Sequence, residues 1–318
     1  MIIELFGLYL IVEVALFESI FVQITEVQKM NSKELKNREN KKPEWLKVTG
    51  FNGEGYERVN NLIRDLKLNT VCHSANCPNR GECYNRGTAT FLIMGHICTR
   101  GCRFCDIATG RPNRLDLDEP KRVADACKIL GLKHVVVTSV DRDDLKDGGA
   151  NHFARTIEEI RKILPETTIE ILTPDFRNVP EAPGIIIGSK PDVFNHNVET
   201  IPRLYRTARP GASYERSLNL LKAIKDNSDI ITKSGLMVGL GETTEEMVEV
   251  FKDMANISRI KVLTIGQYLS PSKNHLPVVK YLHPAEFSEL KHMAIEAGIP
   301  KVISGPLVRS SYRADEFL

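Results

Sequence analysis

Hydrophobic positions follow two alternating patterns between residues 90 and 306. Short runs of consecutive apolar residues, as at 90–95 and 134–140, are typical of buried strands. Between them lie longer segments whose apolar residues recur every three or four positions, as in helices with one buried face. Strands separated by such helices form parallel β-α-β units. Six units and a final strand predict a full or partial (β/α) barrel, and a doubly wound open sheet is the alternative.

Local signals mark the ends of several predicted helices. Gly131 follows the apolar positions of one helix and predicts its end. Thr243 and Glu246 have the spacing of a capping box, and Pro284 is placed to open the last helix. An earlier amphipathic helix at 56–68 is expected to pack on the main body. If the fold is a barrel, functional groups are expected on the loops that follow the strands.

The first 29 residues differ from the rest of the chain. They are apolar, but Glu4, Glu13 and Glu18 interrupt them, and a carboxylate at the centre of a bilayer costs roughly 2.5 kcal/mol or more. They lack the basic start of a secretory signal, and Met30 opens a polar run typical of an ordinary N-terminus. We therefore expect residues 1–29 to be a translation-start artefact or a loose extension, and the protein to be cytoplasmic without a membrane anchor.

Composition narrows the possible functions. The 318 residues have a formal net charge of +2 and no run of lysine and arginine, which gives no reason to expect nucleic-acid binding. All but one of the seven cysteines fall between Cys72 and Cys105. An odd number of clustered cysteines in a large chain without a secretory signal argues against disulfides. It indicates metal binding or catalysis in a reducing compartment.

Cys98, Cys102 and Cys105 lie on the loop directly after the first predicted barrel strand. A structural zinc site normally closes with four ligands, whereas three thiolates on one short loop match three corners of an iron–sulfur cube. One iron would then stay open to a small molecule, as a site of chemistry requires. Arg100 and Arg103 are expected to offset part of the cluster charge.

A second set, Cys72, Cys77 and Cys83, again has no fourth cysteine nearby. Its fourth ligand must come from elsewhere in the chain or from a small molecule. Cys127 is a candidate, but it lies on the apolar face of a predicted helix. A buried core thiol is therefore the favoured interpretation of Cys127.

The C-x3-C-x2-C loop after the first strand resembles the radical S-adenosylmethionine superfamily, and Phe104 before the third cysteine fits that family. The two cysteine motifs, with "VVVTSVDRDDLKDGGA", "TKSGLMVGLGET" and the terminal "RSSY", resemble one branch of it, the lipoyl synthases. The resemblance covers most of residues 43–316. It implies an α/β fold, a partial (β/α)6 TIM-like barrel, at 90–300. An N-terminal arm with the auxiliary-cluster cysteines would span 30–89, and a C-terminal segment would span 301–318.

The resemblance also implies two 4Fe-4S clusters and S-adenosylmethionine as cofactors. The ligands of the radical cluster would be Cys98, Cys102 and Cys105, and those of the auxiliary cluster Cys72, Cys77 and Cys83. A serine of the RSSY motif completes the auxiliary cluster in the family, and Ser311 is favoured here over Ser310. Candidates for contacts with S-adenosylmethionine are Asn195 and Lys233, and Arg309 of the RSSY motif is a further cofactor-binding candidate.

The implied activity is that of a sulfurtransferase. An octanoyl group on a lysine of a carrier protein becomes a lipoyl group by sulfur insertion at C6 and C8, with two S-adenosylmethionine molecules consumed and the auxiliary cluster as sulfur donor. A radical is needed because no side-chain acid or base removes an unactivated methylene hydrogen. The implied partners are octanoylated lipoyl domains of 2-oxoacid dehydrogenases, the glycine cleavage H protein, a flavodoxin- or ferredoxin-type reductant and a cluster-assembly carrier.

Three other interpretations stay open from the residues alone. The first is a different radical enzyme, of a methylthiolating or biotin-forming type. The second is an electron carrier whose two clusters are fully ligated, which S-adenosylmethionine would not perturb. The third is a zinc protein, which would be colourless.

Overall fold

The computed structural model describes residues 42–48 and 50–316. The chain divides into two compact units, 1–44 and 45–318. Only 42–44 of the first unit are described, so the predictions made for residues 1–29 and for Met30 lie outside the described residues. The second unit holds both cysteine sets. None of the described helices combines the length and apolar character that crossing a membrane requires.

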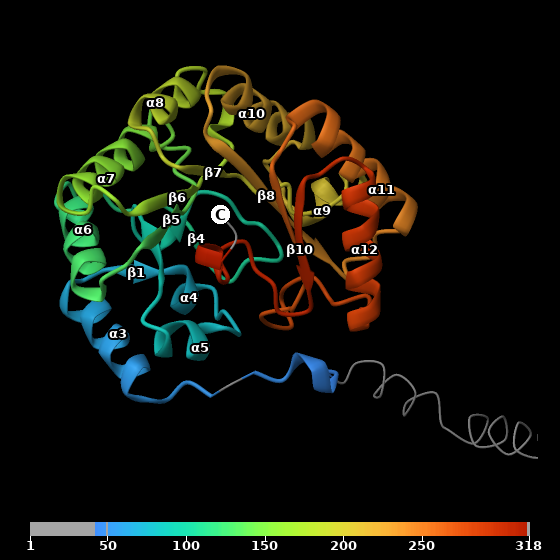
Figure 1. Cartoon of the computed structure of the whole chain (residues 1–318), viewed down its shortest axis with the longest axis horizontal. Helices are drawn as coiled ribbons and strands as arrows, with labels where there is room; N and C mark the ends of the chain where they lie inside the picture. The colour runs from blue at the N-terminus through green and yellow to red at the C-terminus, as the bar shows by residue number, and fades with distance from the viewer. Residues whose placement is uncertain (1–41, 49, 317–318) are drawn as a thin grey trace, which may run out of the picture. The chain divides into compact units, whose positions relative to one another are not determined.

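An eight-stranded sheet forms the centre of the second unit (Figure 1). Its order is β1-β2-β5-β6-β7-β8-β9-β10, and every neighbouring pair is parallel except β1 with β2. The bounds are β1 Asn69–Thr70, β2 Thr90–Ile93, β5 His134–Ser139, β6 Thr168–Leu172, β7 Val193–Asn195, β8 Ile231–Val238, β9 Val262–Gln267 and β10 Lys301–Gly305. From β2 onward the spatial order follows the chain order, which a doubly wound sheet would reverse. Within the described residues β1 and β10 do not pair, so the predicted partial barrel is confirmed.

Helices connect the parallel strands, and all of them except the short α9 form the outer ring in Figure 1. Their bounds are α6 Glu119–Leu130, α7 Ala150–Ile163, α8 Ala182–Ser189, α9 Tyr205–Ala208, α10 Tyr214–Asn227, α11 Thr244–Asp253 and α12 Pro284–Glu296. Shorter helical turns are η1 Glu44–Leu46, η2 Phe176–Asn178, η3 Pro202–Leu204, η4 Met254–Ser258 and η5 Ala314–Glu316. Side chains from both layers fill the core, including Phe91, Phe153, Phe194, Phe251 and Phe287. The predicted β-α-β alternation is therefore confirmed.

The predicted helix ends are also found. Gly131 caps α6 in the left-handed conformation (φ 64°), which costs glycine little. Thr243 Oγ1 accepts from Glu246 N at 3.3 Å, and Glu246 Oε2 accepts from Thr243 N at 2.9 Å, which completes the capping box of α11. Pro284 is the first residue of α12.

The segment before the barrel packs against it through small helices. α3 (Glu54–Asp65) buries Tyr56, Val59 and Ile63, which confirms the predicted packing of this amphipathic segment. α4 (Val71–Ser74) and α5 (Arg80–Asn85) follow and hold the second set of cysteines. The cysteine segment therefore belongs to the same compact unit as the barrel.

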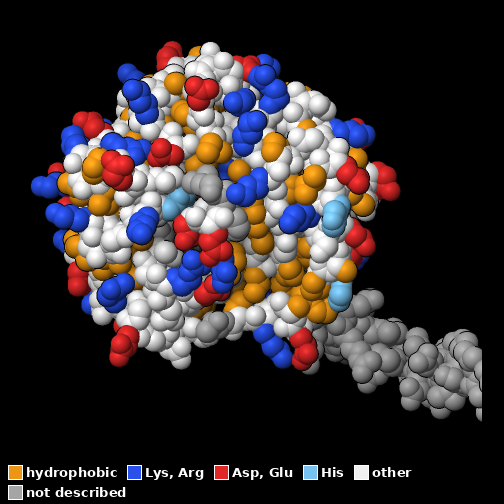
Figure 2. All heavy atoms as spheres, in the orientation of Figure 1, with side chains coloured by type: hydrophobic (Ala, Val, Ile, Leu, Met, Phe, Trp, Pro, Cys, Tyr) orange, Lys and Arg blue, Asp and Glu red, His pale blue; other side chains and the backbone are white. Residues whose placement is uncertain are grey.

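The C-terminal segment turns back inside the ring after β10. In Figure 1, η5 lies within the circle of strands. Ala314 of η5 lines a cavity together with Val136 of β5 and Cys72 of α4, although these residues are far apart in the sequence. Figure 2 shows charged side chains of both signs gathered at the middle of this face. The C-terminal residues thus meet the cysteine-bearing helices.

Candidate active site with two cysteine cavities

A two-stranded parallel sheet, which the sequence did not predict, closes the base of the first cysteine loop. β3 (Ile97–Cys98) pairs with β4 (Ala108–Thr109). Cys98 is therefore fixed by strand pairing, and Cys102 and Cys105 lie in the loop that the small sheet encloses.

Two distant segments hold the same loop. Arg103 N donates to Ala208 O at 2.9 Å, and Leu276 N donates to Arg103 O at 3.0 Å. His275 Nε2 donates to Cys105 O at 3.1 Å. The loop therefore has backbone anchors at the end of α9 and in the turn before α12, as a preorganised ligand loop needs.

All three thiols of this loop line one cavity of about 170 Å³, named here the loop cavity. Its other polar walls come from the carboxyl ends of three neighbouring strands. They are Ser139 at the end of β5 and Asp141 after it, Thr173 after β6, and His196, Asn197 and Glu199 after β7. This is the end at which barrels place their functional groups, as expected.

Arg100 fixes the loop to the strand ends. Its guanidinium pairs with Asp143 at 2.7 Å, with Asp175 at 2.7 Å and with Asp141 at 3.3 Å. The Arg100 side chain is buried, so these pairs are little screened by water. Arg100 was predicted to offset cluster charge, but its charge is already balanced by three carboxylates, and its visible role is to clamp the loop.

Arg209 is a second buried cation that lines the loop cavity with the thiols. Its Nη1 donates to Asn197 O at 2.9 Å, and its Nε has no partner among the described residues. Burial raises the pKa of the Cys102 thiol, and the charge of Arg209 acts against that increase. An unpaired buried guanidinium nitrogen beside a thiol suits an anionic group in the loop cavity.

The remaining thiols of both sets are neutral at ordinary pH in the metal-free chain. Burial raises the pKa of Cys98 and of Cys105 to about 12. In the second set, burial raises the pKa of Cys72 to about 11 and that of Cys83 to about 12. Thiolate ligands must be deprotonated, so loading a metal releases protons.

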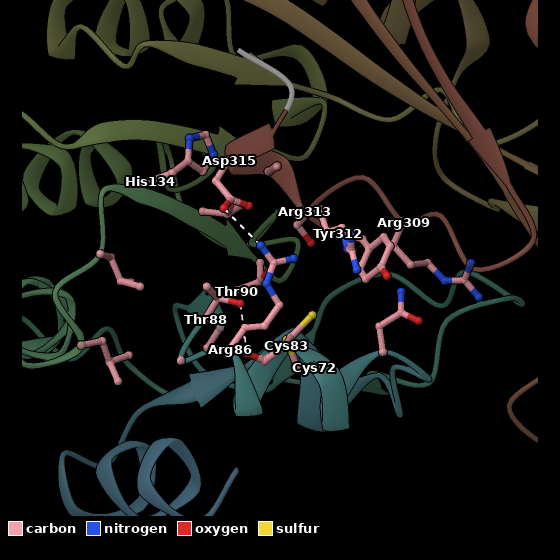
Figure 3. Close-up of a pocket in the computed structure, with 18 of the residues that line it drawn as sticks. Cys72, Cys83, Arg86, Thr88, Thr90, His134, Arg309, Tyr312, Arg313 and Asp315 are labelled. Carbon is pink, nitrogen blue, oxygen red and sulfur yellow. Dashed lines mark hydrogen bonds and ion pairs between the residues drawn. The ribbon is translucent and has the colours of Figure 1, made fainter. Parts of the chain in front are cut away.

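The second set of thiols lines another cavity, of about 280 Å³, named here the auxiliary cavity. Cys72, Cys77 and Cys83 come from α4, α5 and the turn between them. Figure 3 shows Cys72 and Cys83 on one side of this space, with Arg309 and Tyr312 of the C-terminal segment across from them. Val71 lines both cavities, so the two thiol sets line neighbouring cavities that share one wall residue.

The two serines of the RSSY segment have different surroundings. Ser311 lines the auxiliary cavity with the three thiols. Ser310 is not among the residues lining either cavity, and its Oγ accepts a hydrogen bond from Asn197 Nδ2 at 3.1 Å. The preference for Ser311 over Ser310 as an iron ligand is therefore consistent with the geometry.

α5 holds the C-terminal segment in this position. Tyr312 Oη donates to both carboxylate oxygens of Glu82, at 2.9 and 3.0 Å. Arg313 pairs with Glu82 at 2.8 Å, and Arg86 pairs with Glu316 at 3.0 Å. Figure 3 shows Arg86 reaching to Asp315 of η5 in the same way. The helix that bears Cys83 thus also positions the neighbours of Ser311.

The residues fit clusters better than a single ion. In the described part of the chain, no three His, Cys, Asp or Glu side chains are close enough to share one metal ion. A four-iron cube binds each thiolate at a different iron and so needs its ligands further apart. All six thiols are free and each set lines one cavity, which suits such a cube.

Three weaker candidates lie away from the loop thiols. Asn195 Nδ2 and Lys233 Nζ both donate to Glu170 Oε1, at 3.0 and 2.9 Å, and neither residue lines the loop cavity. Lys233 is buried, so it is not a solvated charge. Arg309 lines the auxiliary cavity instead. Cys127 is fully buried in the core and lines neither cavity, as the core-thiol interpretation predicted.

Sequence reasoning missed several residues of the site. Arg209, Asn197 and Glu199 line the loop cavity but were not singled out. Asn197 and Glu199 follow a predicted strand end, so their position was a usable signal. Glu82 gave no signal, because its partners lie at the other end of the chain.

A (β/α) barrel with three cysteines on the loop after its first parallel strand defines the class of radical S-adenosylmethionine proteins. The family model described as the radical SAM superfamily matches residues 92–254. A second model, described as the N-terminal domain of lipoyl synthase of the radical SAM family, matches residues 21–77 and so begins ahead of Met30.

The particular branch follows from relatives that match along most of the chain. A lipoyl synthase of Caldanaerobacter subterraneus subsp. tengcongensis is 56% identical over 276 residues, 86% of this chain and 96% of that protein. A lipoyl synthase of Caldicellulosiruptor saccharolyticus is 53% identical over 277 residues, 87% of this chain and 97% of that protein. The chain belongs to the lipoyl synthase family.

Solved structures of other proteins superpose on this fold. SuiB of Streptococcus suis bound to S-adenosylmethionine superposes with a TM-score of 0.54 at 14% identity, over 79% of this chain and 55% of SuiB. The [FeFe]-hydrogenase maturase HydG superposes with a TM-score of 0.52 at 14% identity, over 90% of this chain and 71% of HydG. The chain spans only about half of SuiB, and at this identity both comparisons concern the fold alone.

Proposed function

We propose that this protein converts a protein-bound octanoyl group to a lipoyl group by inserting sulfur at C6 and C8. The observation that carries the proposal is the pair of neighbouring cavities that share Val71, each lined by three free thiols, with Ser311 in one of them. When bound, the cofactors supply a hydrogen-abstracting radical in the loop cavity and sulfur in the auxiliary cavity. Membership of the lipoyl synthase family supports this division.

In this proposal Cys98, Cys102 and Cys105 hold the radical cluster, and Arg100 keeps their loop against the strand ends. The remaining wall would bind S-adenosylmethionine, whose charged methionine groups need polar partners. Arg209 has an unpaired Nε beside Cys102 and so suits a carboxylate better than Asn195 or Lys233 does, since both of these contact Glu170.

Cys72, Cys77, Cys83 and Ser311 would hold the auxiliary cluster. A serine oxygen is a harder ligand than a thiolate, so the iron that it binds is the one most easily lost. The chain thereby provides a weak corner through which sulfur can leave. The clamp of Glu82 on Tyr312 keeps the hydroxyl of Ser311 near the thiols without adding a fourth cysteine.

The substrates are proposed to be octanoylated lipoyl domains of 2-oxoacid dehydrogenases and the glycine cleavage H protein. A flavodoxin- or ferredoxin-type reductant and a cluster-assembly carrier would serve the two clusters.

The test is anaerobic incubation of the reconstituted enzyme with an octanoylated lipoyl-domain peptide, S-adenosylmethionine and dithionite. Mass spectrometry should find a peptide that has gained two sulfur atoms. Cleavage of S-adenosylmethionine without any sulfur in the peptide would refute the proposal.

A further inference from the structure

The C-terminal turn is held from two sides. Ser310 Oγ accepts from Asn197 Nδ2 at 3.1 Å, and Tyr312 Oη donates to Glu82 Oε2 at 2.9 Å. Asn197 belongs to the wall of the loop cavity, whereas Glu82 lies on α5 next to Cys83. Ser311 lies between these two anchors and lines the auxiliary cavity.

Asn197 is a rigid support for the turn. Its Nδ2 also donates to Glu199 Oε1 at 3.1 Å, and its carbonyl oxygen accepts from Arg209 at 2.9 Å. A side chain at Gly235 would place its Cβ 2.7 Å from Asn197 Oδ1, so glycine at 235 leaves room for this amide. The Asn197 amide is therefore held by Glu199 and by the room that Gly235 of β8 leaves, and the backbone carbonyl of Asn197 is held by Arg209.

Arg309, at the start of the turn, reinforces the link between the two cavities. It is half-buried and lines the auxiliary cavity, and the Glu199 carboxylate acts electrostatically on its guanidinium. Glu199 belongs to the loop cavity and is the second acceptor of Asn197. Successive residues of the turn thus face both sites.

We propose that Ser310 is a positioning residue that sets Ser311 in the auxiliary cavity through its hydrogen bond to Asn197. Adjacent side chains on a turn point in different directions. When the hydroxyl of Ser310 is bonded to Asn197, the hydroxyl of Ser311 is therefore directed toward the thiols. The inference rests on the proposed function, in which Ser311 is the weak ligand of the auxiliary cluster. It gives the two neighbouring serines separate tasks and ties the ligand to a wall of the loop cavity.

The test compares Ser310→Ala and Ser310→Thr in the anaerobically reconstituted full chain. Ser304→Ala is the matched control, because Ser304 also makes one hydrogen bond from the C-terminal part to the barrel, to Phe287 O at 2.7 Å, but lines neither cavity. Losing one anchoring bond should speed hydrogen exchange at 309–312 by about tenfold in Ser310→Ala. Ser310→Thr keeps the hydroxyl and should restore slow exchange, and Ser304→Ala should leave exchange at 309–312 as in wild type.

Mössbauer spectroscopy gives a second readout, which a general loss of protein stability would not change. The oxygen-ligated iron of the auxiliary cluster should change its signature in Ser310→Ala while the radical cluster stays intact. Unchanged exchange and an unchanged iron signature in Ser310→Ala would overturn the inference. If this variant does not fold, Asn197→Ala removes the same bond from the other side and is judged by the same two readouts. A wild-type enzyme that makes no sulfur-containing peptide would refute the proposed function, whereas hydrogen exchange decides the role of Ser310 independently.

Discussion

Asn76 Nδ2 donates a 2.6 Å hydrogen bond to Asp106 Oδ2. Asn76 directly precedes Cys77 of the auxiliary cavity, and Asp106 directly follows Cys105 of the loop cavity. The bond therefore joins the two cysteine segments, one before the barrel and the other after its first parallel strand. Both sites of the proposed reaction are thereby fixed to each other by a side-chain contact as well as by the shared wall residue Val71.

Asn76 is predicted to stabilise this junction in two ways. Its backbone is left-handed (φ 47°), which asparagine tolerates better than alanine. Asn76→Gly keeps the backbone but loses the bond and should cost about 1 kcal/mol of unfolding free energy. Asn76→Ala adds the backbone cost and should lose about 2 kcal/mol. Urea unfolding of the metal-free chain measures the unfolding free energy of both variants. Equal losses of unfolding free energy in the two variants would show that the left-handed backbone at residue 76 costs alanine nothing extra.

Ser311→Cys is predicted to separate cluster stability from sulfur transfer. A thiolate at this corner binds iron more strongly than the hydroxyl does, so the auxiliary cluster should survive turnover. The peptide should then accumulate with fewer than two sulfur atoms, as mass spectrometry can follow over time. Two sulfur atoms inserted at the wild-type rate would show that a weak corner is not needed.

Lys233 is predicted to act in stability rather than in binding. Its ammonium pairs with the buried carboxylate of Glu170 at 2.9 Å. Lys233→Met would remove the ammonium that pairs with this buried carboxylate and leave the neutral amide of Asn195 as a donor to it, which should cost about 3 kcal/mol or more of unfolding free energy.

A double variant, Lys233→Met with Glu170→Gln, removes both charges and should recover part of that loss. Urea unfolding measures the loss, and equilibrium binding of S-adenosylmethionine provides the contrast. A stable Lys233→Met variant with weakened S-adenosylmethionine binding would instead restore Lys233 as a cofactor contact.

His196 is predicted to make the chain sensitive to acid. Burial, helped by the charges of Arg209 and Arg100 and opposed by Asp175, lowers the pKa of His196 from 6.5 to about 4. Between these values the unfolded chain binds a proton that the folded chain does not, so the unfolding free energy falls as the pH falls. The slope from this group is at most about 1.4 kcal/mol per pH unit.

Comparison with His196→Gln isolates this contribution from other titrating groups. Urea unfolding of the metal-free chain at pH 7, 6 and 5 should show a loss for wild type that exceeds the loss for the variant by about 2 kcal/mol. Parallel pH profiles for the two proteins would mean that His196 titrates normally in the folded chain.

The barrel was predictable because its signals are local. Apolar runs, the capping box of Thr243 and Glu246 and the stop at Gly131 each lie within one element, and all three are present in the structure. The sheet of β3 and β4 was missed because each strand has only two residues, too few for any period to show. The core position of Cys127 was predictable from its helical face.

The site was predictable only as far as its cysteines are clustered in sequence. The pairing of Lys233 with Glu170 joins residues 63 positions apart, and that of Asn197 with Ser310 joins residues 113 positions apart. Neither partner has a pattern of its own that points to the other. Such contacts depend on the closure of the whole fold, so the sequence predicts the thiols but not the groups that hold them.

The two cavities are expected to hold two separate four-iron clusters. Anaerobic reconstitution with iron and sulfide counting tests this expectation most directly, with two triple alanine variants as matched controls, one for Cys98, Cys102 and Cys105 and the other for Cys72, Cys77 and Cys83. The wild-type chain should hold about eight irons, and each variant should hold about four. A wild-type chain with about four irons, or a colourless chain with zinc alone, would contradict this expectation.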